Sequence, residues 1–117
     1  MHVALLYLTS AKVFTVLTKL VVIVAFVYGK GVYFARDFLY SAQETYSPPD
    51  KDGLKYVIQS RVLTGEFTKG DQHMIEAPDK APGVRYDCAV DNEDDPTIFV
   101  TFLDYRMYPE YTISFFG

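Results

Sequence analysis

The chain has 117 residues, of which 50% are hydrophobic, and a formal net charge of −4. This length allows one small domain, and the apolar content supplies a packed core, which argues against a disordered chain. The negative charge gives no basis for direct nucleic-acid binding, and a single cysteine, Cys88, cannot form a disulfide framework.

The first part of the chain is apolar and differs from the rest. Residues 1–28 hold two lysines, Lys12 and Lys19, and all fifteen acidic residues follow this segment. The run over residues 13–28 is rich in β-branched side chains, which favours a strand. Together with residues 3–8 it also has the length of a poor membrane anchor. Three interpretations stay open: a buried strand or helix pair, a signal anchor, or a segment foreign to the domain.

The middle of the chain predicts a turn, a strand, a helix and a loop in that order. Two glycines around Lys30 predict a turn, and the apolar residues 32–35 predict a short strand. Asp37 is a favourable cap for a short helix over residues 38–43. Two prolines and an Asp-Gly pair make residues 47–53 a loop.

The remaining residues are rich in strand signals. Valine, isoleucine, tyrosine and threonine make residues 54–67 a long strand, with Gly65 as a candidate bulge. Further strands are expected over residues 86–90, 97–103 and 111–116, separated by turns and loops. The elements predict an α+β fold with a mainly antiparallel sheet and one short helix.

General chemical motifs do not identify a function. The sequence has no phosphate-binding loop, no dinucleotide-binding glycine pattern and no paired metal-ligand motif. The acidic run over residues 91–95 lacks the ligand spacing of a calcium loop, and His73 follows a turn, where a surface position is the simpler interpretation. The residues alone therefore predict a strand-rich domain and no metal site.

A set of motifs in one order does point to a family. Residues 28–35 read YGKGVYFA, Ser41 follows Tyr33 by eight residues, and Tyr46 follows it by thirteen. This pattern resembles the catalytic domain of the poly(ADP-ribose) polymerase (PARP) superfamily, in its macrodomain-linked mono-ADP-ribosyltransferase branch. Residues 56–70 and several motifs after residue 85 are similar to the C-terminal part of that domain, in the same order.

The resemblance implies that NAD is the substrate and indicates the residues that contact it. Ser41 is expected to bind the nicotinamide amide, and Tyr46 to stack on the nicotinamide ring. Tyr33 would be the second member of the family's His-Tyr-Glu triad and pack along the nicotinamide–ribose unit. The site must stabilise the positive charge that develops on the ribose carbon as nicotinamide leaves.

The third triad position falls on Ile98, where polymer-forming members carry a glutamate. An isoleucine side chain accepts neither a proton nor a hydrogen bond, so it cannot polarise an acceptor hydroxyl for chain growth. The resemblance therefore implies transfer of single ADP-ribose units to glutamate or aspartate side chains of acceptor proteins. By family, the location is nuclear or cytoplasmic.

The first triad position has no counterpart that the sequence reveals. The family's His-Gly pair lies on an early strand, but only the apolar segment precedes Gly29, and no glycine follows His2. We therefore separate residues 1–24, which are not part of the family pattern, from residues 25–117, the C-terminal part of a PARP catalytic domain. The N-terminal half of the ADP-ribosyltransferase fold is expected to be missing or replaced. The alternative function is an inactive remnant, with membrane contact through residues 3–28.

The family pattern makes two further predictions. Tyr33, Ser41 and Tyr46 should line one cleft, with Ile98 at its floor. The chain itself should have little or no transferase activity, because the His-Gly pair and the loop that covers NAD are absent from the pattern. Loss of one preorganised donor typically costs about 10²–10³ in rate.

Overall fold

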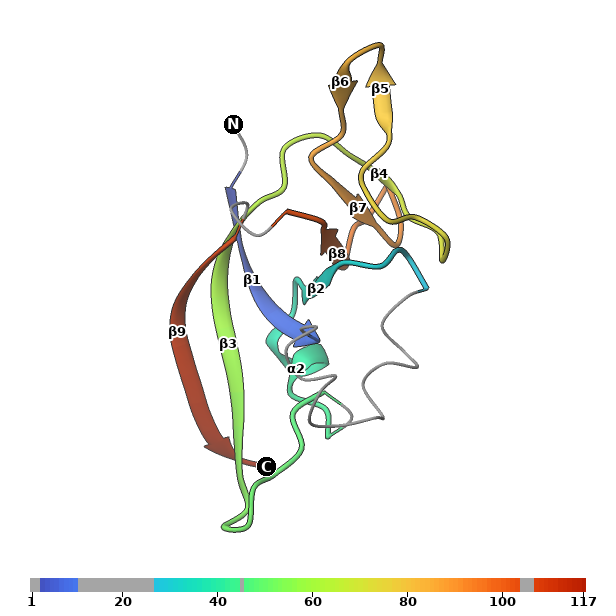
Figure 1. Cartoon of the computed structure of the whole chain (residues 1–117). Helices are drawn as coiled ribbons and strands as arrows, with labels where there is room; N and C mark the ends of the chain where they lie inside the picture. Colours follow the sequence, from blue (N-terminus) through green and yellow to red (C-terminus); the bar gives the residue numbers. More distant parts are fainter. Residues whose placement is uncertain (1–2, 11–26, 45, 104–106) are drawn as a thin grey trace.

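A seven-stranded sheet dominates the structure, a computed structural model that describes residues 3–10, 27–44, 46–103 and 107–117 (Figure 1). One short helix and a separate two-stranded hairpin accompany the sheet in these residues. In chain order the elements are β1 (Val3–Ser10), β2 (Val32–Ala35), α2 (Phe38–Ser41), β3 (Leu54–Leu63), β4 (Phe67–Lys69), β5 (Asp79–Ala81), β6 (Val84–Arg85), β7 (Cys88–Val90), β8 (Ile98–Thr101) and β9 (Met107–Phe116).

The strands of the sheet follow the order β4-β7-β8-β2-β1-β3-β9. Neighbouring strands are antiparallel except β4 and β7, which run parallel. The strands predicted from residues 54–67, 97–103 and 111–116 correspond to β3, β8 and β9 of this one sheet. The α+β prediction with a mainly antiparallel sheet and one short helix is therefore confirmed.

Strand β1 lies inside the sheet, between β2 and β3 (Figure 1). Tyr7 of β1 pairs with Ala35 on one side and with Gln59 on the other. The beginning of the apolar N-terminal segment is thus joined to the same sheet as the strands that follow it. Residues 11–26, which include most of the candidate membrane segment and the predicted boundary at residue 24, lie outside the described residues. Within the described ranges, no helix is long and apolar enough to cross a membrane.

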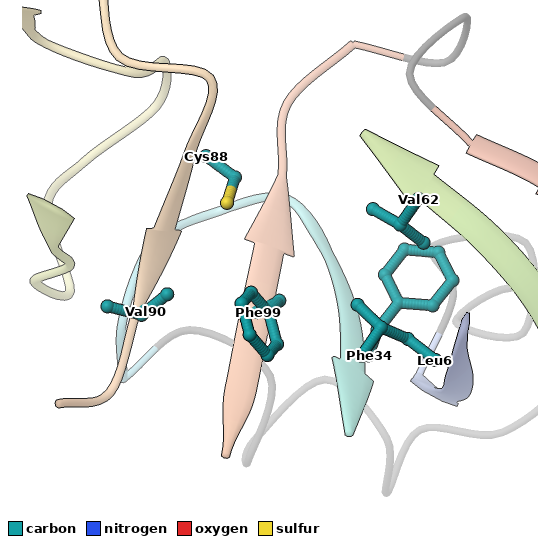
Figure 2. Packing of buried hydrophobic residues seen from close by; sticks show 6 residues of the cluster. All are labelled: Leu6, Phe34, Val62, Cys88, Val90 and Phe99. Atoms are coloured by element: carbon teal, nitrogen blue, oxygen red, sulfur yellow. The ribbon is translucent and has the colours of Figure 1, made fainter. Parts of the chain in front are cut away.

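Both faces of the sheet are packed with apolar side chains. Because side chains alternate along a strand, neighbouring residues of β2, β7 and β8 contribute to opposite faces. Complete burial of a large apolar side chain stabilises the fold by about 1.5–3 kcal/mol. The buried residues on one face, shown in Figure 2, are Leu6, Phe34, Val62, Cys88, Val90 and Phe99. Those on the other face are Tyr33, Ala35, Ala89, Ile98 and Val100.

The long strand expected over residues 54–67 is divided at Gly65. This glycine has a φ of 47°, a left-handed conformation that an extended strand does not adopt. The Glu66 amide that follows donates to the Asp87 carboxylate at 2.8 Å. The chain therefore turns at Gly65 and starts β4 at Phe67, the last residue of the predicted strand.

Two other segments contain more strand than the sequence predicts. The segment between the strands expected over residues 54–67 and 86–90, where turns and loops are predicted, contains the β5–β6 hairpin, which Gly83 closes with a φ of 76°. Strand β9 begins at Met107 and includes Pro109, although the sequence predicts a connection there. Proline is tolerated at this place because β9 is an edge strand, and the register with β3 shifts by a bulge beside it.

Candidate functional site

Tyr33 is buried in β2, and the turn that precedes the strand holds its hydroxyl. The hydroxyl donates to the Gly29 carbonyl at 2.8 Å and accepts from the Tyr28 amide at 2.9 Å. Burial raises the pKa of Tyr33 to about 12, although the two backbone hydrogen bonds oppose the shift. Its side chain is therefore a neutral phenol at physiological pH, a hydrogen-bonding group and not a base.

Ile98 lies beside Tyr33 on the same face of the sheet. It pairs with Ala35 across β2 and β8, and Tyr33 pairs with Val100. The four side chains belong to one buried cluster, in which Ile98 is only 6% exposed. Ile98, which the family pattern predicts for the third triad position, thus belongs to a buried apolar cluster, and its side chain has no carboxylate to offer a reacting hydroxyl.

Asp91, in the acidic turn after β7, fixes the start of β8. One of its carboxylate oxygens accepts from the amides of Thr97 and Ile98, both at 3.0 Å, and the other accepts from the Thr97 hydroxyl at 2.5 Å. Burial by itself would raise the pKa of Asp91, but these hydrogen bonds outweigh it and lower the pKa below its ordinary value. Asp91 therefore positions the backbone of Ile98.

Ser41 ends helix α2 and is fully buried. Its hydroxyl donates to the Tyr7 carbonyl of β1 at 3.0 Å. Its own carbonyl lies 2.7 Å from the Ser47 hydroxyl, which is also 2.9 Å from the Tyr56 carbonyl of β3. The turn after α2 is therefore attached to β3, while the Ser41 side chain is attached to β1.

Tyr46 is stacked on Tyr40. The ring centroids are 5.3 Å apart with the planes at 21°, and the two hydroxyl oxygens are 3.2 Å apart. Burial, assisted by the hydrogen bond to Tyr46, raises the pKa of Tyr40 to about 12. A ring that stacks on Tyr46 must therefore either displace Tyr40 or use the other face of Tyr46.

A cavity of about 840 Å³ opens beside α2. The cavity is wide open to solvent, and its volume lies within the range of about 300–1,000 Å³ found for small-molecule sites. The described residues that line it are Tyr7, Arg36, Asp37, Phe38, Leu39, Tyr40 and Gln43. Because this lining does not include the four residues chosen from the sequence, their common cleft stays a prediction.

The structure brings some of the predicted residues together and adds one. Tyr33 and Ile98 share a cluster, and Ser41 reaches this part of the sheet through Tyr7, which pairs with Ala35 of the same cluster. Tyr46 contacts Tyr40 instead. Tyr7 is not among the residues predicted from the sequence, because strand propensity in residues 3–8 does not say which strands they pair with.

Known proteins resemble this chain in sequence and in fold. The chain is 49% identical over 94 residues to protein mono-ADP-ribosyltransferase PARP14 of Homo sapiens, and 40% identical over 89 residues to PARP10 of Mus musculus. These matches cover 78% and 74% of the chain but only 5% and 9% of the two relatives. No family model matches the chain.

The solved PARP domain of Arabidopsis RADICAL-INDUCED CELL DEATH1 has the same fold. It superimposes with a TM-score of 0.69 over 98% of this chain and 68% of that chain, at 24% sequence identity. The named relatives add the sequence match over most of the chain. The chain therefore belongs to the PARP family of NAD⁺ ADP-ribosyltransferases, in its mono-ADP-ribosyltransferase branch, and corresponds to part of the catalytic domain.

Proposed function

We propose that the domain to which this chain belongs transfers single ADP-ribose units from NAD to protein side chains and releases nicotinamide. The observation that carries the proposal is the apolar surroundings of Ile98 beside Tyr33. The names of the relatives support the same reaction. Because the chain covers a small part of those relatives, the activity is inferred from its own residues.

In the proposed reaction the bond between the nicotinamide nitrogen and the ribose carbon breaks. Its electron pair leaves with nicotinamide, and a carboxylate oxygen of the acceptor protein forms the new bond to the ribose carbon. Tyr33 would pack along the nicotinamide–ribose unit as a neutral phenol, while Ser41 and Tyr46 bind the nicotinamide group. Such positioning lowers the barrier because the reacting groups are already oriented.

The absence of a carboxylate at Ile98 limits the product to one unit. Growth of a chain needs a ribose hydroxyl as the next nucleophile, and a hydroxyl requires a group that accepts its proton. Within the cluster of Tyr33, Ala35, Ile98 and Val100, no side chain is a base at physiological pH. An acceptor carboxylate is already ionised and needs no such group.

The second candidate is a non-catalytic remnant of the domain. The hydrogen bond of Ser41 to Tyr7 and the stack of Tyr46 on Tyr40 favour it, because both NAD-binding groups are engaged within the chain. Membrane contact through residues 3–28 and a nuclear or cytoplasmic location stay predictions. The two candidates differ in whether any ADP-ribose is transferred.

Incubation of the purified chain with labelled NAD and an acidic acceptor protein tests the proposal. We expect weak labelling, by single units that hydroxylamine removes because they are carboxylate esters. Ser41→Ala should abolish this residual signal, because it removes the hydroxyl expected to bind nicotinamide. Polymer ladders would show that Ile98 is not the third triad position. Labelling no stronger than that of Ser41→Ala would favour the remnant.

A further inference from the structure

We propose that Tyr7 closes the nicotinamide end of the site, so that its side chain separates Ser41 from a ligand in the cavity. The proposal rests on the proposed function, because Ser41 is the residue expected to bind the nicotinamide amide. It adds that one side chain of this chain, Tyr7 on β1, blocks access to Ser41. The sequence does not indicate that β1 belongs to the site.

The position of β1 directs Tyr7 to the face of the candidate site. Leu6 packs with Phe34 in the cluster of Figure 2, on the opposite face. Because side chains alternate along a strand, Tyr7 lies on the face of Tyr33 and Ile98. Its pairing with Ala35, a member of that cluster, agrees with this placement. Tyr7 is therefore a neighbour of the triad positions in space, although it is far from them in sequence.

The backbone carbonyl of Tyr7 accepts the hydrogen bond that the Ser41 hydroxyl would otherwise donate to a ligand. A serine hydroxyl has one proton to donate, and here it is donated to the Tyr7 carbonyl at 3.0 Å. The oxygen of a nicotinamide amide needs the same proton. This bond alone is a weak barrier, because a ligand amide can replace it with an equivalent neutral hydrogen bond.

The ring of Tyr7 is the stronger barrier, since it is held from two other elements. It meets the Phe38 ring of α2 edge-on, with the centroids 5.6 Å apart and the planes at 78°. The Gln59 side-chain amide of β3 donates to the Tyr7 hydroxyl at 3.3 Å. Phe38 in turn packs on Phe115 of β9, at 5.1 Å between centroids. The ring is therefore fixed where it stands.

The cavity beside α2 shows the consequence of this arrangement. Tyr7 and Phe38 are among its described lining residues, whereas Ser41 is fully buried and is not. In the proposed arrangement, a ligand in the cavity meets the Tyr7 ring before it reaches the Ser41 hydroxyl. Replacement of the ring by a small side chain should connect the two.

Binding of NAD and of free nicotinamide to variants of the whole chain tests the proposal. We expect Tyr7→Ala to bind both ligands at least about tenfold more tightly than the wild-type chain, which corresponds to about 1.4 kcal/mol. Tyr7→Phe keeps the ring and should show no gain. Tyr108→Ala, which removes an exposed tyrosine from β9, is the matched control. Tyr7→Val, with a strand-forming side chain, repeats the test if the alanine variant does not fold.

The gain must depend on Ser41. Ser41→Ala combined with Tyr7→Ala should lose the added affinity for nicotinamide. Equal affinity of wild type and Tyr7→Ala, or a gain that survives Ser41→Ala, would overturn the proposal. Labelled transfer keeps this result separate from the proposed function. If Tyr7→Ala binds NAD tightly and transfers nothing, the closure stands and the transferase proposal fails. If the wild-type chain binds NAD and transfers ADP-ribose as well as Tyr7→Ala does, the closure by Tyr7 is overturned and the transferase proposal stands.

Discussion

Single side chains determine what the face of the sheet around Tyr33 can do. Its hydroxyl is bound to two backbone groups, and the neighbouring Ile98 is buried and apolar. Neither side chain acts as a base near neutral pH, so in the proposed reaction neither can activate an acceptor hydroxyl. Two residues near Ile98, Asp91 and Thr101, allow the local geometry to be tested without ligand.

Asp91 makes the stability of the fold depend on acid. Its pKa is lowered in the folded chain, so its contribution is complete above the unfolded value of about 3.9 and is lost as the pH falls through the folded value. We expect Asp91→Asn to lower the free energy of unfolding at pH 7, with the difference from wild type shrinking below about pH 4. Urea denaturation between pH 3 and pH 7 measures this.

Asp94→Asn, on the exposed part of the same turn, is the control for Asp91→Asn. A similar loss in both variants would mean that general charge on the turn, and not the bonds to Thr97 and Ile98, stabilises β8. If the free energies of unfolding of wild type and Asp91→Asn differed by the same amount at every pH, the ionised Asp91 carboxylate would not be the stabilising acceptor.

Thr101 should tolerate removal of its hydroxyl. Its Oγ1 is buried without a hydrogen-bond partner in the part of the chain that the structure describes. A buried unsatisfied polar atom costs about 1–3 kcal/mol, so Thr101→Val should raise the free energy of unfolding by about 1 kcal/mol. Thr97→Val removes a hydroxyl that donates to Asp91 and should destabilise the chain. If Thr101→Val also destabilises in thermal denaturation, the hydroxyl has a partner.

At the scale of elements, the turn before β2 requires glycine at position 31, because there is no room for a side chain. A Cβ atom at Gly31 would overlap the Thr101 carbonyl oxygen of the adjacent strand, and backbone cannot move aside as a side chain can. Gly31→Ala should therefore lower the free energy of unfolding by about 1–3 kcal/mol. Lys30→Ala, at the exposed centre of the turn, should change it little. Equal unfolding midpoints for the two variants would contradict the crowding.

Sequence patterns predict the elements whose signals are local. The strand β2, the helix after Asp37 and the strand β8 are each indicated by neighbouring residues. Other features depend on distant partners. Strand β9 extends through Pro109 because it lies at the edge of the sheet, and β1 lies where it does because β2 and β3 pair with it. Propensity says nothing about either neighbour.

At the scale of the whole molecule, the family and the fold class could be predicted from motifs and their order. The contacts of the site could not, because they join segments far apart in the sequence. The bond from Ser41 to Tyr7 spans 34 residues, and the stack of Tyr40 on Tyr46 is a contact that the family resemblance does not imply. Spacing along the chain identifies residue roles in a family, whereas hydrogen bonds depend on how this chain packs.

In the proposed site, the nicotinamide end of NAD lies on the face of Tyr33 and Ile98. Methyl NMR of the isoleucine-labelled chain, titrated with NAD to millimolar concentration, tests this most directly. We predict that the Ile98 methyl signal shifts, through the ring current of nicotinamide, and that it shifts more in Tyr7→Ala. Ile58, four residues before Val62 on β3, lies on the opposite face and should not move. A shift at Ile58 with none at Ile98, in either form of the chain, would contradict the account.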